Sequence, residues 1–201
     1  QQLDATAVVD EKLLDEVTGL VEWPTCLTGQ FDDAFLQLPT QALISSMKEH
    51  QKYFHFVDDK GSILPLFLTV SNIVSRDAQR VIAGNERVIR PRLADAAFFF
   101  ATDKKASLES RNLALGKVVF QAQLGSLLDK TQRVAQLAGK IAHLIGADAD
   151  LASRAGSLCK ADLSTDMVLE FSDLQGLMGK VYALNDGEHV TVAEALEEHY
   201  W

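Results

Sequence analysis

The pattern of residues changes near position 75, and this change most constrains the fold. Residues 53–57 are aromatic or β-branched, residues 59–61 (Asp-Lys-Gly) form a turn signal, and residues 63–74 are a long apolar run. This sequence predicts two neighbouring strands of one sheet. Strand signals nearly vanish after residue 75, and helical spacing of apolar residues continues to the end of the chain. We therefore predict an α+β fold that is mostly α overall, with a small α/β module before an all-helical bundle.

Short helices are predicted around the strands. Leu13, Leu14 and Val17 recur at helical spacing within residues 10–22, and Trp23-Pro24 ends this helix because the residue before proline avoids the helical region. A strand follows at residues 25–31. Asp32 is a predicted N-cap for a turn of helix through Leu38, and residues 40–51 form the next helix.

The pattern after residue 75 predicts a series of helices. A long helical region over residues 77–100 is predicted to be interrupted at Pro91, by a kink or by a fresh helix start, since proline lacks a backbone donor. The strongest amphipathic pattern spans residues 124–146, and it ends at Gly146. Its apolar stripe consists of Leu124, Leu127, Leu128, Val134, Ala138, Ile141, Ala142 and Ile145. Asp148 or Asp150 is predicted to cap the next helix, and further helices are expected over residues 163–171, 174–184 and 192–200. These elements divide the chain into segments 1–76, 77–105 and 106–201.

A basic stretch joins the two parts. Four arginines, Arg80, Arg87, Arg90 and Arg92, stand against one acidic residue, Glu86, so this stretch carries +3 while the rest of the chain carries −12. On a helix, Arg80, Arg87 and Arg90 fall near one face. This face is either a solvated surface paired with nearby carboxylates or a contact for a phosphate backbone. Residues 98–100, three phenylalanines, are predicted to anchor the end of this helix in a core.

The overall charge limits which partners are possible. The net charge is −9 and the pI is about 5, so the field of the whole molecule repels phosphate and any contact with nucleic acid is local. Cys26 and Cys159 form no CxxC motif, which predicts reduced, buried thiols in a cytoplasmic protein. The sequence shows no signal peptide and no apolar run of 18 residues. We expect neither a membrane nor DNA as a partner.

No self-contained catalytic motif is present. The sequence lacks GxSxG, P-loop, GxGxxG and HExxH motifs, and the five histidines are scattered. Asp162, Asp166 and Glu170 are spaced four residues apart, and on a helix they would form an acidic ridge. Such a ridge is either a weak candidate for a divalent cation site or a solvated face that pairs with arginines. We therefore predict no catalytic residue and no resident metal, and we favour a binding module over an enzyme active site.

Two further polar residues are candidates for contact with RNA. Lys52 lies where a helix joins a strand, and Asn85 lies next to Gly84, which permits close approach of a backbone. Ordinary turn chemistry, with Tyr53 and Phe54 in the core, is the alternative for the first of these positions. The predicted RNA-binding set is Lys52, Arg80, Asn85, Arg87, Arg90 and Arg92.

Five strings in order carry a resemblance to a known family. They are LLDEVTGLVEWP, MKEHQKYF, VIAGNERVIRPRLADAAFFF, VVFQAQLGSLLDKTQRV and KADLSTDMVLEFSDLQGLMGKVYAL. Their order and spacing resemble the beta subunit of bacterial glycyl-tRNA synthetase over nearly all 201 residues, as an internal part of a longer chain. The combination of all five is specific, although any single string is not.

The resemblance implies a function that the residues alone do not give. The family's enzyme is an alpha2beta2 heterotetramer that joins glycine to tRNA(Gly) in the cytoplasm, using ATP and magnesium. Its alpha subunit carries the aminoacylation site, and its beta subunit binds tRNA. The helical part of this chain is then expected to resemble an HD domain. The sequence has no His-Asp pair, which is what gives HD phosphohydrolases their metal, and Asp162 stands near where a remnant of that site would be.

Three hypotheses follow. In the first, the chain is a tRNA-contacting and scaffold part of the ligase that needs no cofactor of its own. In the second, it is an HD-type metal-dependent phosphohydrolase that uses Asp162, Asp166 and Glu170. In the third, it is a protein-only docking module for the alpha subunit.

Overall fold

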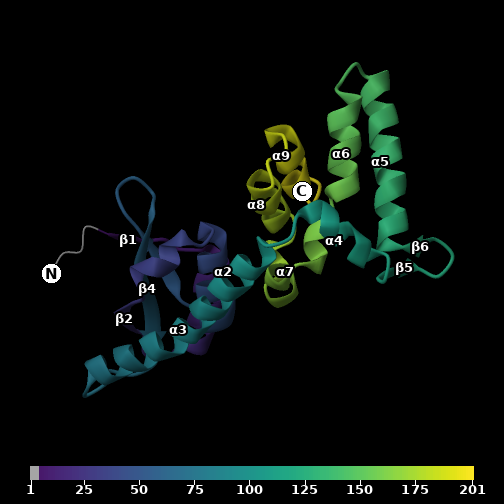
Figure 1. Ribbon diagram of the computed structural model, residues 1–201. Helices are drawn as coiled ribbons and strands as arrows, with labels where there is room; N and C mark the ends of the chain where they lie inside the picture. Colours follow the sequence, from purple (N-terminus) through teal and green to yellow (C-terminus); the bar gives the residue numbers. More distant parts are fainter. Residues whose placement is uncertain (1–4) are drawn as a thin grey trace. The chain divides into compact units, whose positions relative to one another are not determined.

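The structure is a computed structural model that describes residues 5–201, and it divides into two compact units (Figure 1). Among the described residues, the first unit comprises residues 5–98 and the second comprises residues 99–201. The first contains a small antiparallel sheet with helices, and the second is built mainly from helices. This confirms a mostly α protein with a small sheet. The three segments predicted from the sequence, with boundaries after residues 76 and 105, stay a prediction.

A four-stranded sheet organises the first unit. Its strand order is β1-β3-β4-β2, and every neighbouring pair is antiparallel. The strands are β1 (Thr6–Ala7), β2 (Thr25–Gln30), β3 (Phe54–Val57) and β4 (Ile63–Ser71). The prediction that β3 and β4 are neighbouring strands of one sheet is therefore confirmed. Pro65 lies in the central strand β4, where the register with β3 shifts between His55 and Val57. Proline has no backbone N–H to donate, and a strand tolerates this missing donor at a bulge, where the regular hydrogen bonds are already interrupted.

Two helical segments of the first unit begin at aspartate caps, and the sequence predicted the second of these, Asp32. Helix α1 (Glu11–Leu20) starts after Asp10, whose carboxylate accepts a hydrogen bond from the backbone N–H of Leu13. A 3-10 helix, η1 (Asp33–Gln37), follows Asp32, the predicted N-cap. Helix α2 (Thr40–Gln51) has the bounds predicted from the sequence.

The two faces of the sheet are covered by different helices. Leu13 and Val17 of α1 pack with Phe54, Leu68 and Val70 on one face. Because side chains alternate along a strand, Phe67 points to the other face. There its ring stacks on Tyr53, with centroids 4.5 Å apart. The Tyr53 hydroxyl in turn donates a hydrogen bond of 2.6 Å to Asn85 of the next helix, so this helix lies at the second face.

Helix α3 (Ala78–Asp103) contains Pro91 within it, so a fresh helix start predicted at this residue is wrong. It runs through Pro91 without a break. Pro91 is exposed, whereas Ile89, Leu93 and Ala96 are fully buried on the inner side of the helix. Since the apolar residues on both sides of Pro91 share one buried face, packing offsets the cost of about 3 kcal/mol for proline in a helix.

The start of helix α5 (Leu127–Leu144) in the second unit also differs from the prediction. The predicted helix over residues 124–146 begins instead at Leu127, because a short hairpin of β5 (Val119–Gln121) and β6 (Gly125–Ser126) precedes it. Ser126 and Asp129 form a capping box that fixes the start of α5. The other elements of the unit are α4 (Leu108–Leu115), α6 (Ala149–Leu158), η2 (Ala161–Ser164), α7 (Asp166–Glu170), η3 (Ser172–Leu174), α8 (Leu177–Asn185) and α9 (Val190–Glu198).

A buried carboxylate holds several of these helices together. Asp103 accepts hydrogen bonds of 3.0 Å from the backbone N–H groups of Asp166 and Met167 at the start of α7. It also accepts one of 2.9 Å from the Tyr182 hydroxyl of α8 and pairs with Arg111 of α4 at 2.9 Å. Burial, followed by the charge of Asp103, raises the pKa of Tyr182. The side chain that ends α3 is thus a hub of the second unit.

Candidate nucleic-acid interface

Helix α3 presents its arginines away from the core of the first unit. Ile89 and Leu93 are completely buried on the inner face. Arg87 and Arg90 are exposed, and the Arg80 side chain is 89 % exposed. At 3.6 residues per turn, Arg80 and Arg87 lie nearly opposite this inner face, and Arg90 lies on the neighbouring flank. We call these three arginines the cationic face of α3.

The cationic face carries little compensating charge. Arg80 lies 3.8 Å from the Asp77 carboxylate, which is a loose and exposed pair. Across residues 5–201 we find no carboxylate paired with Arg87 or Arg90. The one acidic residue of the stretch, Glu86, accepts a hydrogen bond of 3.0 Å from the backbone N–H of Gln30 on the edge strand β2. Glu86 is therefore held toward the sheet and does not neutralise Arg87.

Small residues lie among these arginines on α3. Ala83 and Ala94 are exposed on the same side of α3, and Gly84 lies beside Ala83. Short side chains leave room for an extended polyanion to approach the guanidinium groups, which bind phosphate in a bidentate manner. This arrangement can hold a phosphate backbone but supplies no nucleophile or general base.

Arg92 lies apart from the cationic face. It is half-buried, and its position follows a different flank of the helix from Arg87 and Arg90. The sequence grouped it with the others because it is close to them along the chain. The structure places its side chain where it is already engaged within the protein.

Asn85 is used inside the first unit. Its side-chain oxygen accepts the 2.6 Å bond from Tyr53, and its side-chain nitrogen donates to the carbonyl oxygen of Val81 at 2.9 Å. Burial raises the pKa of Tyr53 to about 12, so its hydroxyl stays a donor at neutral pH. Asn85 therefore clamps α3 to the sheet. Tyr53 and Phe54 lie in the core, as the alternative interpretation expected.

Lys52 lies at the C-terminal end of helix α2. It caps α2 in the left-handed conformation, with φ of 58°, and its ammonium nitrogen lies 3.0 Å from a carboxylate oxygen of Glu16. The side chain is about one-third exposed. Its charge is thus partly compensated by α1.

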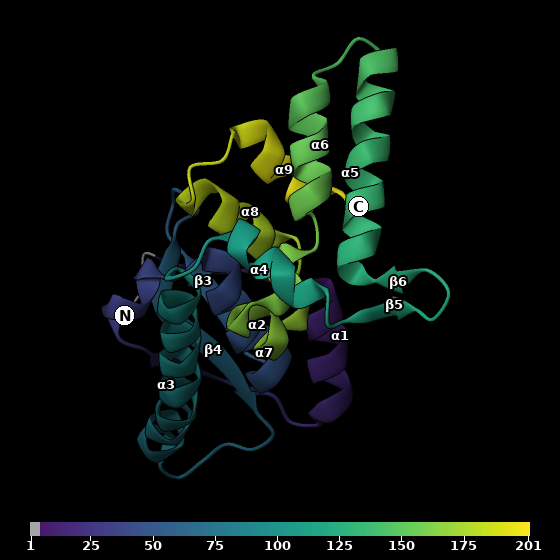
Figure 2. The ribbon, with the colours of Figure 1, turned by 45° about the vertical axis from the view of Figure 1, so that its right-hand side comes forward.

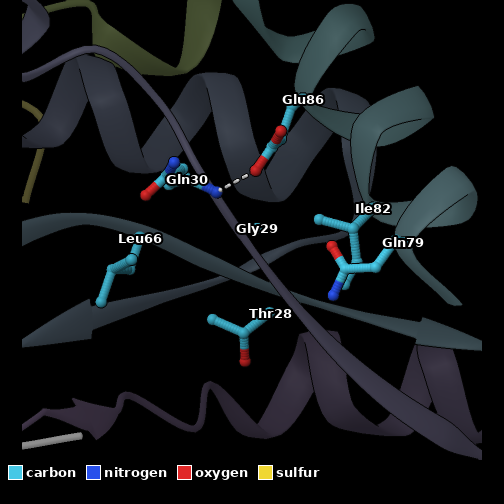
Figure 3. Close-up of a pocket in the computed structure, with 7 residues that line it drawn as sticks. All are labelled: Thr28, Gly29, Gln30, Leu66, Gln79, Ile82 and Glu86. Carbon is cyan, nitrogen blue, oxygen red and sulfur yellow. Dashed lines mark hydrogen bonds between the residues drawn. The ribbon is translucent and has the colours of Figure 1, made fainter.

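A pocket of about 270 Å³ opens between the sheet and α3 (Figure 3). Thr28, Gln30 and Leu66 line it from the strands, and Gln79 and Glu86 line it from the helix. The lining contains a carboxylate and amides but no cationic side chain, so it suits a neutral or cationic group better than phosphate. The hydrogen bond from Gln30 to Glu86 crosses one end of this pocket (Figure 3).

The predicted acidic ridge does not form. Asp162 lies in η2, whereas Asp166 and Glu170 begin and end α7, so the three do not share one helix. Asp162 is buried and accepts a hydrogen bond from the backbone N–H of Gly176 at the start of α8. Burial raises the pKa of its carboxyl. No group of three metal-binding side chains is found within the described residues. Asp162 acts here as a cap for α8, which sequence spacing alone did not show.

Two smaller expectations also need correction. Phe98 is 65 % exposed, and only Phe99 and Phe100 are half-buried, so the aromatic triplet is not a single buried anchor. Both cysteines are free thiols, but only Cys159 is buried, whereas Cys26 is exposed on β2. Sequence reasoning also missed the hub at Asp103, because an Asp followed by two lysines is typical of a solvated break.

The structure thus shows a mostly helical protein with a small antiparallel sheet and a face of exposed arginines on α3. Among residues 5–201, we find no helix with the length and hydrophobicity needed to cross a membrane. Comparison with known proteins then identifies the family. The family model described as "Glycyl-tRNA synthetase beta subunit" matches residues 1–201. The chain therefore belongs to the glycyl-tRNA synthetase beta subunit family.

Individual relatives agree with this assignment. The glycine–tRNA ligase beta subunit of Chromohalobacter salexigens is 63 % identical over 197 residues, which cover 98 % of this chain and 29 % of that protein. Those of Marinobacter nauticus and Pseudoalteromonas atlantica are 62 % and 56 % identical, over 96 % and 100 % of the chain and 28 % and 29 % of those proteins. The chain thus spans less than a third of the length of these relatives.

Proposed function

We propose that this chain is a tRNA-contacting and scaffold part of a glycine–tRNA ligase beta subunit. In this proposal the cationic face of α3 contacts the phosphate backbone of tRNA(Gly). The observation that carries it is the exposure of Arg87 and Arg90 on one side of the helix, with no carboxylate paired to either within residues 5–201. In a chain of net charge −9, an uncompensated cationic surface suits a local polyanion contact better than general binding.

The remaining parts of the proposal rest on family membership. The whole enzyme is proposed to be a cytoplasmic alpha2beta2 heterotetramer that uses ATP and magnesium, with the aminoacylation chemistry on the alpha subunit. This chain then supplies binding and support rather than catalysis. The second unit is proposed to be an HD-like helical module without phosphohydrolase activity, since the sequence has no His-Asp pair and one carboxylate oxygen of the buried Asp162 accepts a hydrogen bond from Gly176.

A docking role is the second candidate. The same exposed arginines can pair with acidic residues of the alpha subunit instead of RNA. Charge reversal at Arg90, written Arg90→Glu, separates the two roles in the whole enzyme. Loss of alpha-subunit binding with unchanged tRNA affinity supports docking, and loss of tRNA affinity with intact assembly supports the RNA contact.

The direct test is a fluorescence-anisotropy titration of the chain with tRNA(Gly) and with an unrelated tRNA, at low and moderate salt. We expect binding that weakens steeply as salt rises, because bound counterions are released from the phosphates. A preference for tRNA(Gly) would add recognition of shape or bases. Absence of binding even at low salt would contradict the proposal for this part of the subunit.

A further inference from the structure

Helix α5 exposes a continuous row of large aliphatic side chains. Leu137, Ile141, Leu144 and Ile145 are 59 %, 48 %, 81 % and 74 % exposed, and Val134 begins the same row one turn earlier. These residues recur at helical spacing and therefore lie along one side of the helix. We call the five residues the α5 stripe. A contiguous apolar surface of this kind marks an interaction site more often than a scattered exposed residue does.

The stripe is exposed because α5 packs on α6 through a different and narrower face. Ala135 and Ala142 are buried there. A Cβ on Gly156 of α6 would lie 2.7 Å from the Ala135 Cα, so the two backbones approach closely. Figures 1 and 2 show α5 and α6 as neighbouring helices that extend beyond α4 of the same unit. The small residues Ala135, Ala142 and Gly156 lie at the contact between the two helices, while the large aliphatic residues of the stripe stay partly exposed.

An apolar groove continues from the stripe. It has a volume of about 300 Å³, and α5, α6 and α9 all contribute to its walls. Its lining consists of Val134, Ala138, Ala152, Ala155, Gly156, Cys159, Ala195 and His199. Val134 belongs to both the groove and the stripe. The walls are almost entirely short apolar side chains, so the groove has space for a larger aliphatic or aromatic side chain from elsewhere.

A lysine lies beside His199, one of the residues that line the groove. The Lys160 ammonium nitrogen lies 2.7 Å from Nε2 of His199 and 3.6 Å from the centre of the Tyr200 ring. Burial, followed by the charge of Lys160, lowers the pKa of His199, which favours the neutral imidazole. An acidic side chain arriving beside the groove would therefore find a lysine already held in place.

We propose that the α5 stripe and its groove receive an amphipathic helix from another part of the same beta subunit, outside residues 1–201. Such a helix would place an aliphatic or aromatic residue in the groove and an acidic residue near Lys160. This inference depends on family membership and on the described surface, and it is independent of the proposed tRNA contact.

Two observations favour an occupant from the same chain over a separate molecule. The relatives that match this chain are more than three times its length, so most of the beta subunit lies outside the segment. In addition, the stripe and the groove together comprise twelve residues, fewer than the roughly 20–30 residues per side that a stable interface between separate chains involves. A tethered segment needs less area, because its effective concentration is about millimolar for a short flexible link.

Site-specific photo-crosslinking in the full-length beta subunit tests the inference. The photoreactive residue p-benzoylphenylalanine replaces Ile141 or Leu144, and Gln136 on the exposed polar side of α5 serves as the matched control position. We expect a crosslink within one beta chain, from positions 141 and 144 to a peptide outside residues 1–201, and none from position 136. The yield should not change with dilution or with addition of the alpha subunit. No tRNA is present, so failure here leaves the tRNA proposal untouched.

Three results would overturn the inference. They are a crosslink to the alpha subunit, a crosslink between two beta chains that disappears on dilution, and absence of any crosslink at positions 141 and 144. A second variant guards against a chance contact: Leu137→Asp in the same chain should abolish the crosslink from position 144. Leu137 is solvent-exposed in the segment, so the helix content of this variant should be unchanged by circular dichroism. A crosslink that persists in this variant also contradicts the inference.

Discussion

Replacing Arg87 and Arg90 with alanine tests the cationic face of α3 most directly. The two residues lie three positions apart, which is about 4.5 Å along the helix axis at a rise of about 1.5 Å per residue. Both are exposed, so their side chains can reach adjacent phosphates of one strand. Removal of one phosphate contact should reduce the slope of log K against log salt concentration by about 0.7 to 0.9.

The expected loss of affinity is modest because these arginines stay in contact with water. An exposed ion pair contributes about 0.2–1 kcal/mol. Since 1.4 kcal/mol is a factor of ten, each single replacement should raise Kd by up to about fivefold. The double variant should show the sum of both effects in the salt slope. The assay is the anisotropy titration with tRNA(Gly) over a series of salt concentrations.

Arg133→Ala is the matched control. Arg133 is an exposed arginine on α5 in the second unit, and its removal changes the net charge by the same amount. We expect its effect on the salt slope to be near zero. An equal effect in Arg133→Ala and Arg87→Ala would show that the net charge of the chain, not the α3 surface, controls binding. Unchanged slope and affinity in the Arg87 and Arg90 variants would refute the assignment of the RNA contact to α3.

Three predictions concern stability, each followed by urea unfolding with circular dichroism. Asp103→Ala should destabilise the second unit by about 3–5 kcal/mol, because it leaves the partly buried Arg111 guanidinium without its carboxylate; a loss below about 1 kcal/mol would contradict the hub. In the wild-type protein, the free energy of unfolding should fall as pH rises above about 3.9, because burial raises the pKa of the Asp162 carboxyl and the folded state then binds more protons than the unfolded state. Asp162→Asn should remove this decrease. A difference in the free energy of unfolding between the wild type and Asp162→Asn that does not change with pH would contradict this prediction. Gly29→Ala should cost about 1–3 kcal/mol, because the added Cβ would overlap the buried Phe67 ring; unchanged stability would show that the ring can move aside.

Local signals in the sequence were sufficient for several elements. The bounds of α2, the cap at Asp32 and the pairing of β3 with β4 follow from residues close together in the chain, and the structure confirms them. The family resemblance was likewise carried by strings of adjacent residues. In contrast, a fresh helix start at Pro91 was wrong, because burial of Ile89 and Leu93 on one face holds α3 together.

The candidate site was only partly accessible from spacing. The sequence placed Arg80, Arg87 and Arg90 near one helix face, and the structure shows them exposed together. It could not reveal that Asn85 is bound to Tyr53, because these two residues are 32 positions apart and their contact depends on how α3 packs against the sheet. For the same reason, nothing in the spacing of Asp162, Asp166 and Glu170 showed that they lie on two separate helices.

By itself, the sequence determined the family, the mixed order of strands and helices, and the periodic faces of the longer helices. These properties depend on neighbouring residues and on repeats of a few positions. The tertiary structure decided which polar groups are already used and which apolar faces remain open. Asp103 became a buried hub, Asp162 became a cap, and the apolar stripe of α5 was left exposed while small residues closed its contact with α6. Those outcomes depend on which distant segments pack together, and no single stretch of the chain contains that information.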